Sequence, residues 1–315
     1  MRSLRALNAV ALVVTLVACG KPAKEPPPSS ELAAGAPPLS VFVVNYPLAF
    51  FAERIGGDAV AVSFPAPPGE DPASWSPDPE TVAAYQGADL ILLNGADYAK
   101  WVARASLPAA RLVDTGAAYA DRLIALEEAV THAHGPEGEH AHGGVAFTTW
   151  LDPTLALEQA RAIAAALGEA RPEQSAAFRE RLAALEADLT ALDERVQAAA
   201  DGLGDAPVVF SHPVNQYLER RYGLNGRSVH WEPGVEPSKK QWRELEGLRR
   251  EHPARWMVWE GEPLPSVVTR LEEQGVTSVV FTPCGNVPEE GDLLAVLSAN
   301  VDRLEAAWGT ARDPA

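Results

Sequence analysis

The sequence lacks the short motifs that mark the common catalytic sites. It contains no GxSxG nucleophile elbow, no HExxH helix, no P-loop and no GxGxxG fingerprint. The neighbours Ser211 and His212 do not make a catalytic pair either, because adjacent residues on a strand point to opposite faces and cannot readily act as nucleophile and base. We therefore expect a protein that is not an enzyme.

Positive charge is scarce throughout the chain. Its 315 residues include 26 Lys and Arg against 43 Asp and Glu, which gives a formal net charge of −17. This acidic balance argues against binding to nucleic acid and against attachment to a membrane through a polybasic patch. The chain is long enough for two domains of ordinary size, each with its own core.

Long apolar runs are also missing, except near the N-terminus. Ala6–Ala18 is almost wholly apolar and follows a short basic region that contains Arg2 and Arg5. At about thirteen residues this run is too short to span a bilayer as a helix, but it has the length of a signal-peptide core. We predict that residues 1–18 are a signal peptide and that the protein is exported.

Cysteine is nearly absent, and one of the two cysteines closes the apolar run. The sequence Leu-Val-Ala-Cys that ends at Cys19 resembles the bacterial lipobox, in which the cysteine carries the lipid; the alternative is an ordinary signal peptide with a coincidental cysteine. Residues 19–39 are rich in Pro and Ala, as membrane tethers are. We expect an exported lipoprotein on the periplasmic side of a membrane, inner or outer. Cys284 would then be the single remaining thiol, which excludes an intrachain disulfide.

Strand-like and helix-like segments alternate in both halves of the remaining chain. Apolar runs such as VFVV, ADLILLNG, APVVFS and ARWMVWEG indicate buried strands, and helical patterns separate them, including one near residues 96–105 and one that Gly168 ends. This alternation predicts mainly parallel sheets flanked by helices, which is the α/β class. We predict an N-terminal lobe over residues 40–170 and a C-terminal lobe over residues 204–315.

A long amphipathic segment separates these two lobes. Over residues 171–203, apolar side chains recur every three or four positions, which predicts one continuous helix; they are Phe178, Leu182, Leu185, Leu189, Leu192 and Val196. Such a helix is about 45 Å long, more than one small lobe needs. We predict that it joins the two lobes as a rigid connection.

Histidine is concentrated in one segment, residues 131–144. Its four glycines, its proline and its lack of an apolar period predict a mobile surface loop. Neutral imidazoles on such a loop are candidate ligands for zinc, copper or nickel. The candidate ligands of this segment are His132, His134, His140 and His142.

Several motifs in a fixed order resemble one receptor family. The order is PPGEDPASWSPDP, ADLILLNGADYAKWV, the His-rich loop with TWLDP, the long helix, FSHPVNQYLERRYGL, VEPSKKQWRELEGL and VVFTPCGN. This order is similar to that of the metal-binding solute receptors of zinc and manganese ABC importers, called cluster A-I. The resemblance also implies a receptor fold like that of cell-adhesion proteins. The resemblance implies two α/β lobes joined by one long helix. It also implies capture of a divalent metal, Zn²⁺ first with Mn²⁺ or Cu as alternatives, and delivery by a monomer to a permease in the inner membrane.

The ligand set that the resemblance implies is incomplete in this chain. In the family, four side chains hold one metal between the lobes, and imidazole and carboxylate donors suit zinc or manganese. The matching positions are Ala73, Thr148, His212 and Thr282. An alanine methyl cannot bind a metal, and threonine hydroxyls are poor zinc ligands, so only His212 is an ordinary ligand.

Three explanations of this departure stay open. In the first, the ligands have moved, so that His140 or His142 meets His212 in the cleft with help from nearby donors, which are Glu70, Asp71, Glu260 and Cys284. In the second, the cleft binds a small organic ligand or a metal chelate between aromatic walls, formed by Trp75, Trp150, Trp231 and Trp259. In the third, the cleft is structural and the His-rich loop alone buffers metal at the membrane surface.

Four further residues carry individual expectations. Glu260 ends an apolar strand, so it either pairs with a basic residue or faces the cleft. His230 and His252 stand in polar surroundings, and we expect them to face solvent. Cys284 is a candidate soft ligand, but we expect an inert buried thiol.

Overall fold

The computed structural model describes residues 37–126, 130–133, 139–142 and 144–309. The predicted signal peptide, the predicted lipidation site Cys19 and the candidate ligand His134 lie outside these residues. Within the described part of the chain, no helix has both the length and the apolar character needed to cross a bilayer.

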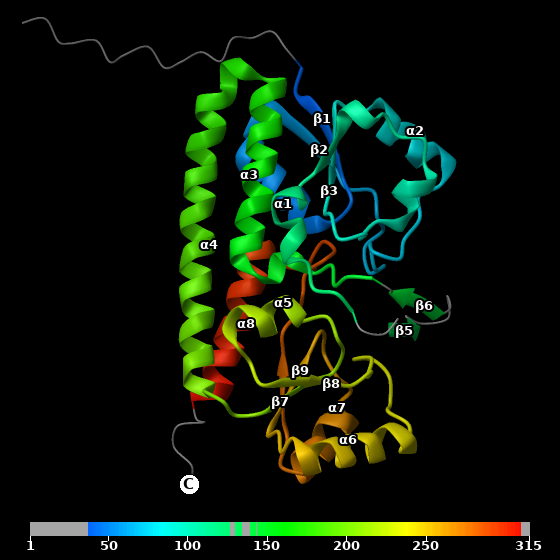
Figure 1. Cartoon of the computed structure of the whole chain (residues 1–315), viewed down its shortest axis with the longest axis vertical. Coiled ribbons are helices and arrows are strands. Elements are labelled where there is room, and N and C mark those ends of the chain that lie inside the picture. Colours follow the sequence, from blue (N-terminus) through cyan, green and yellow to red (C-terminus); the bar gives the residue numbers. More distant parts are fainter. Residues whose placement is uncertain (1–36, 127–129, 134–138, 143, 310–315) are drawn as a thin grey trace, which may run out of the picture. The chain divides into compact units, whose positions relative to one another are not determined.

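The first sheet is parallel, with strand order β2-β1-β3-β4 (Figure 1). Its central strand β1 is buried at alternate positions, and Val41 pairs with Val62 on one side and Leu90 on the other. Helix α1 (Tyr46–Gly56) begins where the side chain of Asn45 accepts a hydrogen bond from the amide of Leu48. The other elements are β1 (Leu39–Val43), β2 (Val60–Ser63), α2 (Pro79–Gly87), β3 (Leu90–Leu93), β4 (Leu112–Asp114) and α3 (Pro153–Ala170).

The second sheet is also parallel, with strand order β10-β9-β7-β8. The four residues of β9, WMVW, are all buried because neighbours cover both edges and both faces of this strand. Helix α6 begins with a capping box between Ser238 and Gln241. The elements are β7 (Val208–Phe210), α5 (Gln216–Tyr222), β8 (Gly226–Ser228), α6 (Lys239–Glu251), β9 (Trp256–Trp259), α7 (Pro265–Glu273), β10 (Thr277–Val280) and α8 (Leu293–Trp308).

Helix α4 (Ser175–Leu203) connects the two sheets along the chain. It contacts α3 and α1 of the first lobe and α8 and α5 of the second (Figure 1). Its buried stripe includes Phe178, Leu185, Leu189 and Leu192, as the apolar spacing predicts. The prediction of two parallel-sheet lobes with one long helix is therefore confirmed, although a short 3-10 turn (Pro172–Gln174) precedes the helix.

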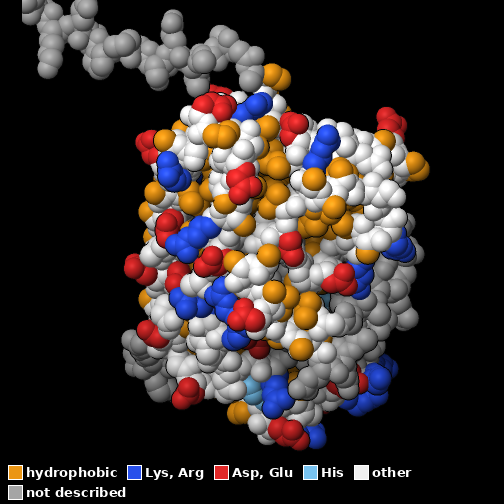
Figure 2. Space-filling view, turned by 45° about the horizontal axis from the view of Figure 1, so that its top comes forward, with side chains coloured by type: hydrophobic (Ala, Val, Ile, Leu, Met, Phe, Trp, Pro, Cys, Tyr) orange, Lys and Arg blue, Asp and Glu red, His pale blue; other side chains and the backbone are white. Residues whose placement is uncertain are grey.

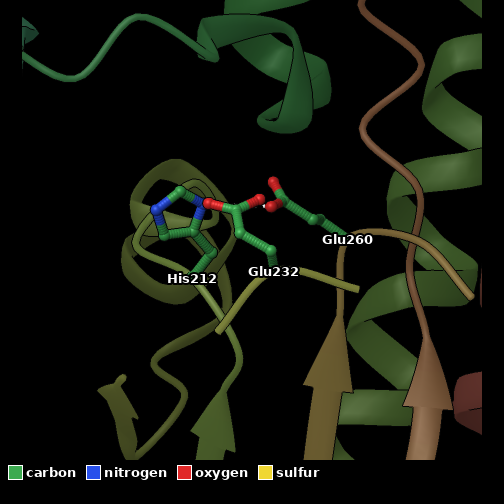
Figure 3. Close-up of side chains that lie close together, drawn as sticks. All are labelled: His212, Glu232 and Glu260. Carbon is green, nitrogen blue, oxygen red and sulfur yellow. Dashed lines mark hydrogen bonds and ion pairs between the residues drawn. The ribbon is translucent and has the colours of Figure 1, made fainter. Parts of the chain in front are cut away.

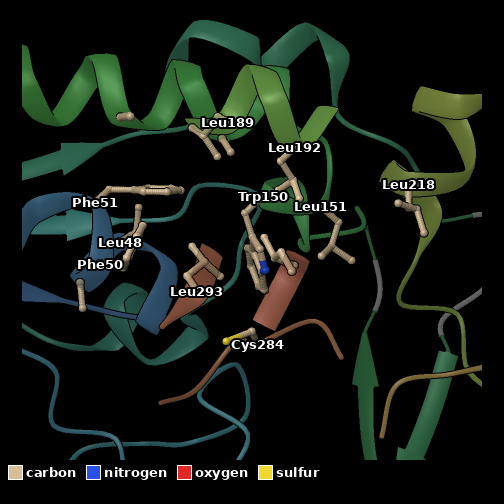
Figure 4. Close-up of a cluster of buried hydrophobic side chains, with 14 of the residues drawn as sticks. Leu48, Phe50, Phe51, Trp150, Leu151, Leu189, Leu192, Leu218, Cys284 and Leu293 are labelled. Carbon is tan, nitrogen blue, oxygen red and sulfur yellow. The ribbon is translucent and has the colours of Figure 1, made fainter. Parts of the chain in front are cut away.

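The main core lies where α1, α3, α4 and α8 meet. Figure 4 shows Phe51 of α1, Leu189 and Leu192 of α4 and Leu293 of α8 around Trp150, and all five are buried. Burial of one such side chain stabilises a fold by about 1.5–3 kcal/mol. The long helix thus shares one continuous core with elements from both lobes.

The outer surface mixes charges of both signs. On the face shown in Figure 2, acidic and basic side chains are interspersed and form no polybasic patch among the described residues. Ion pairs such as Arg54–Asp188 and Arg195–Asp302 join helices across this surface, each at 2.6 Å. Exposed pairs of this kind contribute little to stability.

Three local predictions are wrong. Residues 96–105 form only a 3-10 helix (Lys100–Arg104), because Gly95, Ala96 and Asp97 adopt successive left-handed conformations that an α-helix cannot include. Helix α3 continues past Gly168 to Ala170. The His-rich segment is not only a loop, since β5 (Val130–Ala133) pairs antiparallel with β6 (Glu139–His142).

Candidate metal centre

A histidine and two glutamates meet at the carboxyl edge of the second sheet. His212 follows β7 by two residues, Glu260 directly follows β9, and Glu232 follows β8 by four residues. Since β8, β7 and β9 are parallel neighbours, the residues after them lie at the same edge. The amide of Trp231 donates to the carbonyl of Ser211 at 2.7 Å, which places Glu232 beside His212.

The three side chains point toward one another (Figure 3). His212 Nδ1 lies 3.0 Å from Glu260 Oε1, and one donor atom of each residue lies within 4.8 Å of the other two. Ligands bound to one cation at about 2.0–2.2 Å must lie at such separations. The His212 side chain is fully buried and that of Glu260 is 16% exposed, so a cation here would be largely shielded from water.

The electrostatics of the cluster favour positive charge. Burial alone would lower the pKa of His212, but the hydrogen bond and charge of Glu260, together with the charges of Glu232 and Asp71, outweigh burial. The net result is a raised pKa for His212. A metal ion would take the place of the proton on this imidazole, because a ligating histidine must be neutral.

The cluster opens onto a cleft of about 1300 Å³. His212 and Glu260 line it together with Thr148, Trp150 and the loop around Asp71. A single cation occupies only a small part of such a volume. The cleft is therefore large enough for a larger ligand beside a bound ion.

The family ligand positions offer little to a metal in this structure. Ala73 is buried in the first lobe and has no donor atom. The hydroxyl of Thr148 donates to the carbonyl of Val214 at 2.5 Å, so this hydroxyl makes a structural hydrogen bond. The backbone amide of Thr282 donates to Asn300 Oδ1 at 3.1 Å, which fixes its backbone, and its hydroxyl is at most a poor zinc ligand at the cleft wall. That Ala73, Thr148 and Thr282 do not bind the metal stays a prediction.

Of the predicted donors, the structure brings Glu260 to His212. His132, His140 and His142 lie on β5 and β6, where the backbones of His132 and His140 are paired, but their side chains are outside the structural description. Whether they reach the cleft stays a prediction. Glu232 was missed, although it follows the strand-like run RSVHW as Glu260 follows WMVW.

The predicted aromatic wall is only partly present. Trp150 lines the cleft, and its indole donates to the carbonyl of Pro283 at 2.7 Å. Trp231 and Trp259 are buried in the core of the second lobe, and Trp75 packs against Trp101. Tyr98 and Phe147, which the sequence did not single out, supply the other aromatic lining.

Three of the individually considered residues have clear environments. His230 is exposed, as expected, with its ring 5.8 Å from that of His212. The expectation for His252 is wrong: it is buried at the end of α6, and its Nε2 lies 2.9 Å from the carbonyl of Val208. Cys284 is buried, and burial raises the pKa of its thiol to about 12, which fits an inert thiol.

Comparison with protein families gives a match over almost the whole described chain. Residues 41–307 match the family described as "Zinc-uptake complex component A periplasmic". The high-affinity zinc uptake system protein ZnuA of Bacillus subtilis is 26% identical over 283 residues, which cover 85% of this chain and 86% of that protein. The manganese ABC transporter substrate-binding lipoprotein PsaA of Streptococcus pneumoniae is 26% identical over 236 residues, covering 72% and 70%.

Solved structures share the fold. The metal-dependent lipoprotein YcdH from Bacillus subtilis superposes with a TM-score of 0.72 at 22% identity, covering 85% of this chain and 98% of that chain. The Zn(II)-bound ZnuA-like domain of AdcA from Streptococcus pneumoniae gives a TM-score of 0.70 at 20% identity, covering 86% and 99%. At these identities the likeness concerns the two-lobe architecture alone.

Proposed function

The chain belongs to the family of periplasmic zinc-uptake component A proteins, and from this premise we propose that His212, Glu232 and Glu260 bind its metal cargo. As a member of this family, the protein is the metal-binding component of an ABC importer. The family is one of transport receptors and not of enzymes. The site, the metal and the partners of this chain are what we propose beyond the family role.

One observation supports the site above all others. A buried histidine and two glutamates meet where three neighbouring parallel strands end, at the wall of the cleft. An imidazole and carboxylates are ordinary ligands for a divalent transition metal. The acidic pair also compensates the charge of the ion, which an apolar cleft wall could not do.

The cargo that we propose is zinc first, with manganese as the alternative. Zinc is the metal named for the Bacillus subtilis relative, whereas manganese and iron are named for streptococcal relatives. Imidazole suits zinc, and carboxylates suit manganese as well. Copper is a weaker candidate, because Cys284, the described soft donor at the cleft, is buried as a thiol.

The partners follow from the role of the family. We propose that an ABC permease in the inner membrane receives the metal, and that a lipid on Cys19 holds the receptor as a monomer on the periplasmic side of a membrane. Residues 19–39 would act as the tether. The His-rich segment 131–144 would gather metal near the cleft through its imidazoles, and His132, His134, His140 and His142 are the candidates.

The test is a calorimetric titration of the mature lipoprotein in detergent micelles with zinc. His212→Ala should weaken the tight site by more than about 100-fold, because loss of even an outer partner of a ligand costs 10–100-fold. Glu262→Gln is the control, since Glu262 is an exposed acid two residues after Glu260. Equal zinc affinity in His212→Ala and the unchanged protein would refute the proposed site.

The same titration separates the alternatives. A tight site that disappears when residues 132–142 are deleted, and not with His212→Ala, would assign the metal to the His-rich segment. Weak and multiple binding alone would favour a membrane-surface metal buffer or a cleft for a chelate.

A further inference from the structure

One exposed segment at the rim of the cleft has few attachments. It consists of residues 66–70, with the sequence APPGE, and we call it the strap. Pro68, Gly69 and Glu70 of the strap are exposed and line the same cleft as His212. Its two prolines have no amide hydrogen to donate, so the strap can make few backbone hydrogen bonds.

The residues that follow the strap are firmly attached to the first lobe. The amides of Ser74 and Trp75 donate to the carbonyl of Asp71 at 3.1 and 3.0 Å. Ala73 is buried, and the ring of Trp75 packs against that of Trp101. Residues 71–75 therefore have hydrogen bonds and packing of their own and do not depend on the strap.

Hydrogen bonds between the strap and the rest of the described chain come from Asn286 alone. The side-chain amide of Asn286 donates to the carbonyl of Pro67 at 2.7 Å and to the carbonyl of Glu70 at 2.8 Å. Within the strap, the amide of Glu70 donates to the carbonyl of Pro67 at 3.3 Å. Gly69 has φ 80, which glycine adopts readily, and a Cβ there would meet no atom within 4 Å. The strap thus has room to pivot once Asn286 lets go.

The segment that carries Asn286 is held in place by other contacts. The amide of Tyr46 donates to the carbonyl of Gly285 at 3.0 Å. The indole of Trp150 donates to the carbonyl of Pro283 at 2.7 Å. The two hydrogen bonds to the strap therefore start from a fixed base.

The side chain of Asn286 is fully used in this arrangement. Its Oδ1 accepts a hydrogen bond from the amide of Val287 at 2.6 Å, which sets the direction of Nδ2. An asparagine amide has two N–H donors, and the carbonyls of the strap take both. One side chain thus decides whether the strap is attached or free.

From this contrast we propose that Asn286 is a latch, which keeps the strap at the rim of the cleft and thereby sets how fast the metal cargo enters and leaves. The inference rests on the proposed function, because it takes the cleft as the path of the metal. Asn286 is not one of the three clustered ligands (Figure 3) and acts through the position of the strap. It is therefore a positioning residue.

A latch has a kinetic signature that differs from that of a ligand. The hydrogen bonds of Asn286 to the strap do not involve the ion, so their loss should raise the rates of metal entry and release by the same factor. The affinity should then stay nearly unchanged. Loss of a ligand would instead accelerate release alone and weaken binding.

The test is a stopped-flow measurement of zinc entry, and of zinc release to an excess of chelator, on the mature lipoprotein in detergent micelles. We expect Asn286→Ala to raise both rates by about 20-fold, because each ordinary hydrogen bond that is lost shifts an opening equilibrium by about 5-fold. Calorimetric titration should give nearly the same zinc affinity as for the unchanged protein.

A second variant and a matched control sharpen this test. Asn286→Asp keeps the acceptor for the amide of Val287 but has no N–H for the strap. Its added negative charge attracts the cation and would slow release, so faster release in this variant cannot come from the charge. Asn225→Asp is the control, because the amide of Asn225 also donates to a carbonyl, that of Asp205 at 3.0 Å, but Asn225 does not line the cleft.

Three results would overturn the inference, and they differ from failure of the proposed site. Unchanged rates in both Asn286 variants, while His212→Ala abolishes tight binding, would remove the latch and leave the proposed function intact. Faster release with unchanged entry would make Asn286 a support of the bound ion and not a latch. The same acceleration in Asn225→Asp would reduce the effect to general destabilisation. If His212→Ala also bound zinc normally, the proposed function itself would fail.

Discussion

The residues that follow the strands of the two sheets differ in chemistry. After the strands of the first sheet come Asn45, Asn94 and Thr115, which are buried and neutral. After the strands of the second sheet come His212, Glu232 and Glu260, which can carry charge. The carboxyl ends of the strands therefore carry neutral side chains in the first lobe and ionisable side chains in the second.

The neutral edge is a structural network. Asn45 Nδ2 donates to Asn94 Oδ1 at 2.9 Å, Gln159 Nε2 donates to the same oxygen at 3.1 Å, and Asn94 Nδ2 donates to the carbonyl of Phe147 at 3.0 Å. These bonds hold the segment before Thr148 against the first sheet. The difference teaches that the edge of the first sheet is structural, whereas the edge of the second sheet carries the ionisable side chains of the proposed metal site.

The largest effect that this comparison predicts is on stability. Asn94→Ala should lower the free energy of unfolding by about 3 kcal/mol, because it leaves several buried polar groups without partners. Zinc affinity of the folded protein should change little. Chemical denaturation and zinc titration measure the two quantities, and Asn225→Ala, on the exposed side of the second lobe, is the control. If Asn94→Ala instead lost much of its zinc affinity and kept its stability, the edge of the first sheet would serve metal binding and not structure.

The second effect is on binding. Glu260→Gln should weaken zinc binding by about 10–100-fold, since the amide is a poor ligand and no longer supports His212. The unfolding free energy of the metal-free protein should fall by about 1–3 kcal/mol, because the fully buried imidazole of His212 loses its charged partner. The pKa of His212 should fall, since the charge and hydrogen bond of Glu260 raise it. An NMR titration of the imidazole checks the direction, and a further rise would contradict the proposed pairing.

The third effect is on the pH dependence of stability and concerns Glu219 in the second lobe. Burial raises the pKa of this carboxyl to about 7. A group with a raised folded pKa contributes its stability below the unfolded value of about 4.3, and that contribution is lost as pH rises through 7. The unfolding free energy of Glu219→Gln should therefore exceed that of the unchanged protein by about 1 kcal/mol at pH 8, after allowance for partial exposure. At pH 4 the two unfolding free energies should be equal.

Thermal unfolding at the two pH values measures this difference. Glu246→Gln is the matched control, because Glu246 is exposed on α6. An equal gain at both pH values would show that the charge of Glu219 is not the cause.

The smallest effect concerns the hydrogen bond between the lobes at Thr148. Thr148→Val keeps the shape but removes the donor to the carbonyl of Val214, which should cost about 1 kcal/mol of unfolding free energy. Zinc affinity should stay the same if Thr148 is structural. Thr190→Val, at an exposed position of α4, is the control. A marked loss of zinc affinity in Thr148→Val but not in this control would show that the Thr148 hydroxyl belongs to the metal site.

Much of the fold could be predicted because local patterns agree with the tertiary structure. The apolar stripe of α4 and the run WMVW of β9 are visible in the sequence, and the packing uses both. The failure at residues 96–105 has a backbone cause. Left-handed conformations at Ala96 and Asp97 depend on the packing of the turn and leave no mark in composition.

Two members of the proposed cluster could be singled out from the sequence because they follow clear strands, and the third could not. His212 and Glu260 stand at the ends of strongly apolar strands, whereas Glu232 follows β8, a strand of three residues whose pairing with β7 decides its position. His252 was placed wrongly because its neighbours in sequence are polar. Its burial arises from packing against β7, where its ring contacts the carbonyl of Val208.

The most direct test of the proposed metal site is the crystal structure of the zinc-loaded protein with anomalous scattering at the zinc edge. We predict one strong anomalous peak in the cleft, bonded to His212, Glu232 and Glu260. A principal peak within residues 131–144, with none beside His212, would contradict this site.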